Sequence, residues 1–267
     1  MSQPRWIRYI RSLRQFWASS LEAELEYQLN LVVELLAVLG NLTGSLLVLN
    51  LLAGPSRHLG GWSWTSAVVV VGIYTLLEGF TSAVLQPNLS HIVNHVQNGT
   101  LDFVLLKPID SQFWLSTRSF SPWGLPGIAA GLVLISWAVM QSDTAIRPEA
   151  VILAASLMLA AAVILYSLWF LLAGLSIWFV KIWNATEVLR YTLVAGRYPI
   201  SAYPPALRWV FTFLLPVAFL TTVPAEALLG RGSWPWALGS LLAAALSLIA
   251  TRLFWTLALR HYTSASS

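Results

Sequence analysis

Residues 150–180 read AVILAASLMLAAAVILYSLWFLLAGLSIWFV, a run of 31 residues without a charged side chain. As an α-helix this run would be about 46 Å long at 1.5 Å per residue, which exceeds the roughly 30 Å hydrocarbon core of a bilayer. A helix of this length either tilts in the membrane or projects beyond it. The run therefore predicts a membrane-spanning helix.

The composition of the whole chain agrees with this prediction. Of the 267 residues, 57% are apolar and only 10% are charged, whereas a soluble domain carries roughly 25% charged residues. Fourteen Trp residues suit the membrane–water interface, which indole rings favour. Only helices and closed barrels satisfy the backbone in lipid, and the continuous apolar runs lack the alternation of barrel strands. We expect an all-α integral membrane protein.

Six uncharged runs predict six transmembrane helices, at 35–56, 58–77, 119–142, 150–180, 209–225 and 232–251. The fifth run is the least regular, because Pro216 and Pro224 each remove a backbone donor and kink or break a helix. Broken backbone at membrane depth is tolerated only inside protein or beside a cavity. Two arrangements fit this sequence: short re-entrant helices on the outer side, within 216–233, or one kinked helix that ends at Gly230.

The distribution of Lys and Arg orients these predicted spans. With the N-terminus inside, three basic residues fall outside, at Arg57, Arg147 and Arg231. Twelve fall inside, at Arg5, Arg8, Arg11, Arg14, Lys107, Arg118, Lys181, Arg190, Arg197, Arg208, Arg252 and Arg260. Because basic loops remain in the cytoplasm, we expect both termini there.

Residues 1–28 precede the first span and form a separate element. Apolar residues recur at helical spacing, at Trp6, Ile10, Leu13, Trp17, Leu21 and Leu25, and arginines cover the opposite side. This pattern predicts an amphipathic helix lying in the cytoplasmic interface. An ordinary basic tail beside the membrane is the alternative.

The segment 88–118, between the second and third predicted spans, is too broken to cross a bilayer. Asn88-Leu89-Ser90 predicts the start of a helix, and Asn98-Gly99 predicts its end near residue 97, because Gly readily adopts the left-handed conformation. Residues 101–106 supply apolar side chains, and Pro108 ends this second element. Such a short element suits docking of another protein, and a connector packed under the bundle is the alternative.

Two acids, Glu34 and Glu78, lie at or near membrane depth. Charges there are costly and usually face a cavity or a partner, so both are candidates for a pathway or gating role. Glu34 is alternatively an interfacial residue that reaches water. Glu78 is alternatively a hydrogen-bonding group between helices, since Gly72 and Gly79 would let another helix approach closely.

The sequence contains few residues suited to catalysis. No G-x-x-x-x-G-K-[ST] loop is present, so the chain does not hydrolyse ATP by that route. His91 and His95 share one helical face, but Ile92 stands where a zinc protease has Glu, and solvated histidines are the simpler interpretation. Cysteine is absent, which excludes a thiolate metal site.

Six spans are few for a closed pathway, so a dimer is the natural unit. The pairs Gly40/Gly44 and Gly127/Gly131 have the G-x-x-x-G spacing of close helix contacts, and they are candidates for the contact between subunits. The motif is also common by chance in apolar sequence.

Two motifs, QNGTLDFVLLKPID (97–110) and LPVAFLTTVPAEALLG (215–230), resemble permease subunits of the ABC-2 transporter family. The resemblance is closest to a branch once classed as a domain of unknown function. The matching positions are Gly99, Leu101-Asp102 and Leu105 to Pro108 in the first motif, and Pro216, Phe219 and Pro224-Ala225 in the second. The six spans and the amphipathic start extend the resemblance over the whole chain.

The resemblance implies a single ABC-2 (type V exporter-like) transmembrane domain over 1–267, in the plasma (inner) membrane. Such a permease pairs with a second permease subunit, as a homodimer or heterodimer, and with a separate ABC ATP-binding subunit that holds ATP and Mg. Substrate would move outward through the dimer interface, in contact with membrane lipids. The chain itself would carry no cofactor, metal or catalytic residue, and it would not bind nucleic acid.

The resemblance and the residue patterns together suggest two sets of site residues. The expected ATPase-coupling residues are His91, His95, Asn98, Gly99, Leu101, Asp102, Lys107 and Pro108. The expected pathway or gating residues are Glu34, Glu78, Pro216, Phe219 and Pro224. Two alternative functions remain open: an intramembrane enzyme that uses the two acids and two histidines, and a scaffold subunit without transport.

Overall fold

The computed structural model describes residues 5–24, 26, 29–142, 147–179 and 183–262. Leu25 of the predicted apolar stripe and Lys181 of the predicted inner basic set lie outside the described residues. The described α-helices are α1 (Arg5–Glu24), α2 (Leu29–Ala53), α3 (Trp64–Phe80), α4 (Gln86–Gln97), α5 (Leu101–Leu105), α6 (Ser111–Thr117), α7 (Leu125–Met140), α8 (Pro148–Gly174), α9 (Trp183–Leu193), α10 (Pro205–Trp209), α11 (Val217–Leu220), α12 (Thr222–Leu228) and α13 (Trp234–His261).

Shorter elements connect these helices. Strands β1 (His58–Leu59) and β2 (Trp62–Ser63) form an antiparallel hairpin. π-helical turns cover Thr81–Leu85 and Val210–Leu214, and 3₁₀ turns cover Pro122–Gly124, Leu175–Ile177, Val194–Arg197 and Ile200–Ala202.

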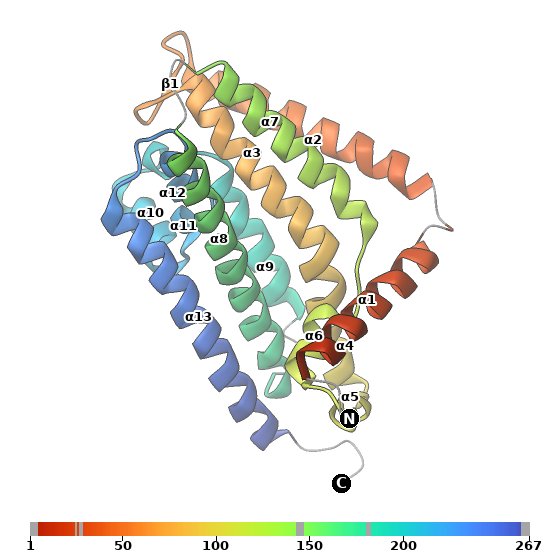
Figure 1. The fold of residues 1–267 in the computed structure, drawn as a ribbon. Coiled ribbons are helices and arrows are strands. Elements are labelled where there is room, and N and C mark those ends of the chain that lie inside the picture. The colour runs from red at the N-terminus through yellow and green to blue at the C-terminus, as the bar shows by residue number, and fades with distance from the viewer. Residues whose placement is uncertain (1–4, 25, 27–28, 143–146, 180–182, 263–267) are drawn as a thin grey trace.

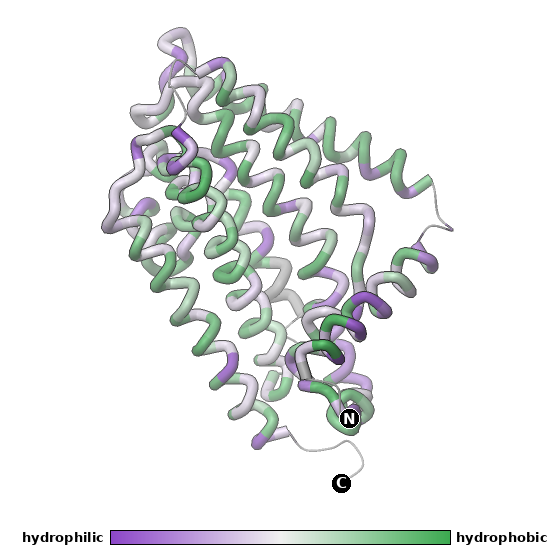
Figure 2. Tube along the Cα trace, viewed as in Figure 1, coloured by the Kyte–Doolittle hydropathy of each residue, from purple (hydrophilic) through white to green (hydrophobic). Residues whose placement is uncertain are grey.

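The elements form an elongated helical bundle with two distinct ends (Figure 1). The hairpin and α10 to α12 lie at one end, here called the hairpin end, while α5 and α6 lie at the other, here called the α5 end. α1 begins and α13 ends at the α5 end. Apolar residues dominate the long helices, and hydrophilic residues gather on α1 and near the two ends (Figure 2).

Five described helical segments are long and apolar enough to cross a membrane: Leu29–Ala53, Trp64–Gln97, Pro122–Met140, Pro148–Ile177 and Trp234–His261. A sixth is added if Pro205–Leu214 and Val217–Leu228 count as one broken span. The predicted all-α membrane protein is therefore confirmed.

The second span begins later than predicted and continues farther. The hairpin occupies the start of the predicted run 58–77, and Ser63 caps the helix by accepting a 3.3 Å hydrogen bond from Ser66 N. The helix then continues through the π-helical turn to Gln97. The helix predicted from Asn88-Leu89-Ser90 is thus the last part of this span and not a separate element.

Pro87 does not break this long helix, because the chain near residue 120 replaces the missing hydrogen bond. The carbonyl left free by Pro87 is that of Ala83, and it accepts a 2.9 Å hydrogen bond from Ser121 N. Asn88, which is buried, donates from Nδ2 to Val84 O (2.6 Å) and to Ser119 O (2.7 Å). The proline is therefore compatible with a continuous helix.

The span predicted at 209–225 is not a straight helix. Its two halves are bent by 70°, because Leu215 has extended backbone (φ −118°, ψ 99°) just before Pro216. Helix α9, which comes before these two halves in the chain, is the segment that runs from the α5 end toward the hairpin end (Figure 1). Arg208 donates 2.8 Å to Ser201 O, and Ser201 Oγ donates 2.8 Å to Gly60 O of the hairpin loop. Arg208 therefore lies at the same end as Arg57, contrary to the sequence prediction.

α3 and α7 pack with their backbones in contact. A Cβ on Gly79 would lie 2.4 Å from Ile128 N, and a Cβ on Gly131 would lie 2.7 Å from Gly72 O. Gly72 and Gly79 thus admit another helix, as predicted, and that helix is α7. The Gly127/Gly131 pair serves this contact within the chain and not the predicted contact between subunits.

Candidate functional site

α5 forms an exposed tip at the α5 end of the bundle (Figure 1). Gly99 ends α4 with φ +65°, and Thr100 N donates 2.9 Å to His95 O, which is the C-terminal cap that the sequence predicts. Leu101 and Val104 are buried, whereas Phe103 is 68% and Leu106 80% exposed. We define the α5 tip as the exposed residues Phe103, Leu105, Leu106, Lys107 and Pro108.

α6 is joined to α13 by polar contacts at its first turn. Asp110 caps α6, with Oδ1 accepting from Phe113 N at 2.9 Å. Its Oδ2 accepts from Arg252 Nη2 of α13 at 2.8 Å, and Arg252 Nη1 donates to Gln112 Oε1 at 3.1 Å. Trp255 Nε1, one turn along α13, donates to Ser111 Oγ at 3.0 Å.

The same helix is joined to α8 through one buried hydroxyl. Gln112 Nε2 donates to Tyr166 Oη at 3.2 Å, and Ser116 Oγ lies 2.9 Å from that atom. Side-chain hydrogen bonds thus join α6 to the two long helices α8 and α13. The α6 residues that make them are Ser111, Gln112 and Ser116, together with the capping residue Asp110. A displacement of α6 would therefore move α8 and α13 with it.

The charge of Asp110 is maintained by its partners. Burial alone would raise the pKa of this carboxyl, but the hydrogen bonds from Arg252 and from Phe113 N outweigh burial. The pKa of Asp110 therefore lies below its usual value. The carboxylate remains ionised at neutral pH and retains its pairing with Arg252.

α1 covers another side of α6. The Tyr9 and Phe113 rings meet edge to face with centroids 4.7 Å apart, and Trp17 Nε1 donates to Thr117 O at 3.2 Å. The predicted apolar stripe of α1 is therefore divided between two surroundings. Trp17 contacts the protein, whereas Trp6 and Ile10 are 64% and 59% exposed.

The predicted coupling histidines lie beside α6 and not beside the acids. His91 is exposed, and His95 Nδ1 lies 2.8 Å from Thr100 Oγ1. Both line a small cavity with Trp114 and Arg118. Within the described ranges, no group of three His, Cys, Asp or Glu residues could hold a metal ion.

The remaining predicted coupling residues surround the tip. Leu101 is fully buried, Asn98 is exposed, and Asp102 is partly exposed and engaged with a partner. Lys107 Nζ lies 5.2 Å from the centre of the Trp114 ring. These residues form a polar and apolar border around Phe103 and Leu106.

The two candidate pathway residues Glu34 and Glu78 line one cavity. This cavity of ≈ 210 Å³ lies between α2, α3 and α7, and Asn41 and Arg190 also line it. Asn41 Nδ2 donates to Glu78 Oε2 at 3.5 Å. The acids and the histidines line different cavities, so the geometry does not assemble the intramembrane enzyme that uses both.

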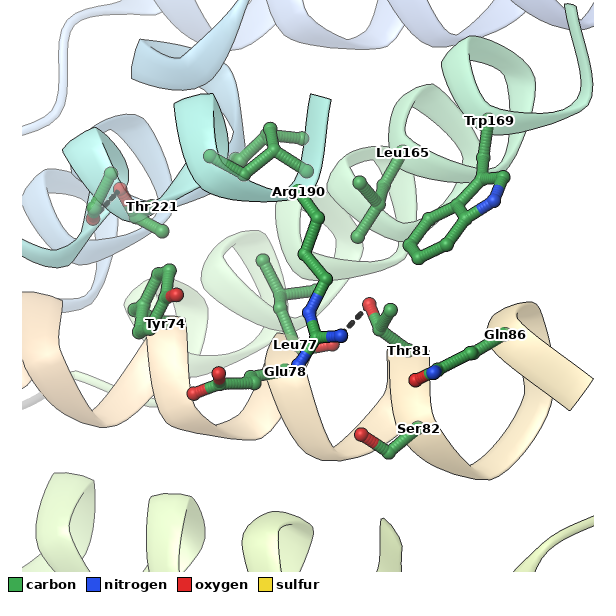
Figure 3. Close-up of a pocket in the computed structure, with 13 residues that line it drawn as sticks. Tyr74, Leu77, Glu78, Thr81, Ser82, Gln86, Leu165, Trp169, Arg190 and Thr221 are labelled. Carbon is green, nitrogen blue, oxygen red and sulfur yellow. Dashed lines mark hydrogen bonds between the residues drawn. The ribbon is translucent and has the colours of Figure 1, made fainter. Parts of the chain in front are cut away.

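A second cavity lies on another side of Glu78 (Figure 3). It is lined mainly by apolar and aromatic side chains, among them Tyr74, Leu77, Leu165, Trp169 and Leu220. Figure 3 shows Arg190 reaching from its helix toward Glu78 and Thr81. Glu78 and Arg190 line both cavities and therefore separate them.

The other candidate pathway residues, Pro216, Phe219 and Pro224, line neither of the two cavities that contain Glu78. Pro216 lies at the 70° bend, while Phe219 and Pro224 are buried in the two short helices that follow. The second cavity is lined by Leu220 and Thr221 of this segment but not by those three residues. Thr221 Oγ1 donates to Gly196 O at 2.7 Å, which holds the segment against the turn after α9.

Sequence reasoning missed two arginines that approach Glu78 in the bundle. Arg190 and Arg197 both interact electrostatically with Glu78, and the Arg197 guanidinium lies 4.8 Å from the Tyr74 ring centre. From the sequence, both arginines are expected only among the basic residues of the inner loops. Their spacing of seven residues, which puts two side chains on one helical face, was the signal available.

The long apolar helices define a multi-pass membrane protein. Residues 39–266 match the family model described as ABC-2 family transporter protein. The chain therefore belongs to the ABC-2 transporter family and is a permease component of an ABC transporter, as the resemblance predicts. Permeases of this family generally work with ATP-binding subunits. A comparison with curated proteins gives no match.

Proposed function

We propose that this chain is the membrane-spanning subunit of an exporter and that a separate ATP-binding subunit docks on the α5 tip. The observation that carries the proposal is the exposure of Phe103 and Leu106 at one end of the bundle. Large apolar side chains grouped outside the membrane-spanning part mark contact sites for other proteins. Lys107 beside them supplies a charge that would orient the partner.

Motion of the docked subunit would enter the bundle through α6. The contacts of Asp110 with Arg252, and of Gln112 with Tyr166, join α6 to α13 and α8. ATP and Mg would be bound by the partner, and this chain would contribute the path for the substrate. His91, His95, Asn98, Gly99 and Asp102 would position the tip.

A second permease subunit would complete the transporter. We expect this second subunit to contact α2, whose Leu36 and Leu39 side chains are 65% and 58% exposed. On the same helix, a Cβ added to Gly40 or Gly44 would meet no other atom within 4 Å, which leaves room for a partner helix. The α5 end, with the basic residues of α1, would face the cytoplasm of a plasma (inner) membrane. Outward transport is proposed from the family resemblance.

Affinity purification from native membranes in mild detergent tests the docking proposal. The native chain should recover a nucleotide-binding protein, and the double variant Phe103→Ser/Leu106→Ser should lose at least about tenfold of it, as expected for central apolar contacts. The control Phe213→Ser/Leu214→Ser alters two residues of similar exposure, 64% and 67%, near the hairpin end. Recovery equal to native in the tip variant would refute the docking site.

A further inference from the structure

α2 and α3 are in close contact only toward the hairpin end. On the α2 face that meets the bundle, Ser45, Leu49 and Ala53 are buried. On the same face toward the α5 end, Glu34, Val38 and Leu42 are only partly buried. The two helices therefore leave between them the ≈ 210 Å³ cavity, here called the α2–α3 cleft.

The α2–α3 cleft is polar, although it lies between apolar spans. Glu34 and Asn41 line it from α2, Thr75 and Glu78 from α3, and Arg190 from α9. Polar groups at membrane depth are costly unless they have partners. A cavity that concentrates them between two spans is thus suited to a polar ligand group.

The two acids of the cleft differ in their partners. Glu78 accepts a hydrogen bond from Asn41 and interacts electrostatically with Arg190 and Arg197. Glu34 interacts with Glu78 as a like charge. Among the described residues, no hydrogen bond or ion pair involves the Glu34 carboxylate. On the α2 side of the cleft, Glu34 thus forms no ion pair with any of the described residues, while Arg190 lines the cleft from α9.

We propose that the α2–α3 cleft binds the protonated amine of a membrane amphiphile. The ammonium group would pair with Glu34 and approach Glu78, and its three N–H donors suit two carboxylates and the Asn41 carbonyl oxygen. The apolar body would remain in lipid along Leu31 and Leu35 of α2, each of which is 43% exposed and neither of which belongs to the surface proposed for the second permease subunit. The inference rests on the proposed function, because it names the substrate class of that permease.

The lining of the cleft distinguishes an amine from other head groups. An anionic group would be repelled by the two carboxylates, Glu34 and Glu78, against the single Arg190 that lines the cleft. A quaternary ammonium is recognised by aromatic faces, and none of the described residues that line the cleft is aromatic. A primary amine needs carboxylates and hydrogen-bond acceptors, and the cleft supplies both.

Lipid retention by the full chain tests this proposal. The purified chain in a neutral maltoside detergent is incubated with equal amounts of phosphatidylethanolamine, phosphatidylcholine and phosphatidylglycerol of the same acyl composition, and retained lipid is counted by native mass spectrometry. We expect phosphatidylethanolamine to be retained about fivefold or more over the other two, and Glu34→Gln to reduce that preference about fivefold, as for a lost charge-assisted contact.

The controls separate charge from folding and assembly. Glu34→Asp should retain much of the preference, and Glu149→Gln, an exposed acid in the first turn of α8, should leave it unchanged. A Glu34→Gln chain with an altered subunit number would assign this acid to subunit contact and refute the proposal. Dodecylamine should displace phosphatidylethanolamine, which would identify the amine as the recognised group, while dodecyltrimethylammonium should not.

Equal retention of the three lipids, or a preference that survives in Glu34→Gln/Glu78→Gln, would overturn the proposal. Failure of dodecylamine to displace bound phosphatidylethanolamine would also overturn the proposal. Because no ATP-binding subunit is present, these results are independent of the docking experiment. Failure of the docking experiment alone would refute the proposed function and leave the amine site standing.

Discussion

α2 and α3 are adjacent spans of nearly equal mean hydropathy, yet their surroundings differ completely. In the most apolar stretch of α2, 6% of the residues are buried inside the chain, against 67% for the span that contains α3. Both helices carry two glycines, but Gly72 and Gly79 contact α7, whereas a Cβ added to Gly40 or Gly44 would meet no other atom within 4 Å. Hydropathy thus predicts that a helix spans the membrane and does not predict what covers it.

The contrast extends to the proposed coupling path. α6 is joined by side-chain hydrogen bonds to α8 and α13, which pack against each other on the side of the bundle away from α2 (Figure 1). Among the described residues, the half of α2 toward the α5 end has one side-chain hydrogen bond to α3, from Asn41 Nδ2 to Glu78 Oε2 at 3.5 Å. We infer that force applied to α6 would move α8 and α13 relative to α2. Such a movement would change the shape of the α2–α3 cleft.

A large loss of stability is expected when a side chain is added at the glycine contact between α3 and α7. In Gly79→Ala, the added Cβ would lie 2.4 Å from the backbone nitrogen of Ile128, which is too close for a normal contact. We expect a loss of about 1–3 kcal/mol or more in stability, since backbone cannot move aside as a side chain can. Thermal unfolding of the purified chain measures this loss. Gly44→Ala, where a Cβ meets open space, is the matched control, and equal losses would refute the contrast.

A smaller effect, on function more than on stability, is expected at the joint between α6 and α13. Arg252→Met removes the partner of Asp110, and the pair is partly exposed (53% and 30%), so the loss of stability is expected to be about 1 kcal/mol or less. We expect stimulation of ATP hydrolysis in the assembled complex to fall about fivefold or more, as for a coupling energy of 1–3 kcal/mol. Arg260→Met, also exposed on α13, should leave it unchanged. Full stimulation in the Arg252 variant would exclude this route.

The contribution of the Asp110–Arg252 pair to the stability of the chain changes with pH in a definite direction. The folded pKa of Asp110 is lowered, so its stabilisation is fully present above the unfolded value of about 3.9 and is lost as pH falls through the folded pKa. The difference in melting temperature between the native chain and Asp110→Asn should therefore be constant from about pH 5 to 8 and shrink in acid. A difference that grows below about pH 4 would have the wrong sign.

The smallest effect is expected on α2 itself. Leu36→Ala removes an exposed side chain, and we expect the melting temperature of the isolated chain to change by an amount equivalent to less than about 0.5 kcal/mol. Ile73→Ala in α3, which is fully buried, should cost about 2–5 kcal/mol. A Leu36→Ala loss close to that of Ile73→Ala would mean that α2 is covered within the chain.

Local sequence patterns predict much of this fold and part of the site. Uncharged runs predict the five regular spans, and Asn98-Gly99 predicts the end of α4. The acids Glu34 and Glu78 were identified from their cost in lipid, and they share one cavity. Each of these features depends on residues close together in the chain or on a single residue's chemistry.

Other features depend on contacts between distant residues, and local patterns do not contain them. The Asp110–Arg252 pair joins positions 142 residues apart. Pro87 was compatible with a continuous helix only because Ser121 satisfies Ala83 O. The G-x-x-x-G spacing likewise indicates close approach without naming the partner, which is why Gly127/Gly131 was assigned to the wrong contact.

The docking of an ATP-binding subunit on the α5 tip is best examined by cross-linking, because the natural chain contains no cysteine. Leu106→Cys places one thiol at a site that is 80% exposed, and Leu214→Cys places one near the hairpin end at a site that is 67% exposed. In native membranes treated with a short thiol–amine cross-linker, Leu106→Cys should give an adduct with a nucleotide-binding protein, and Leu214→Cys should give none. Equal adducts from both positions, or none from Leu106→Cys, would show that the tip is not the docking site.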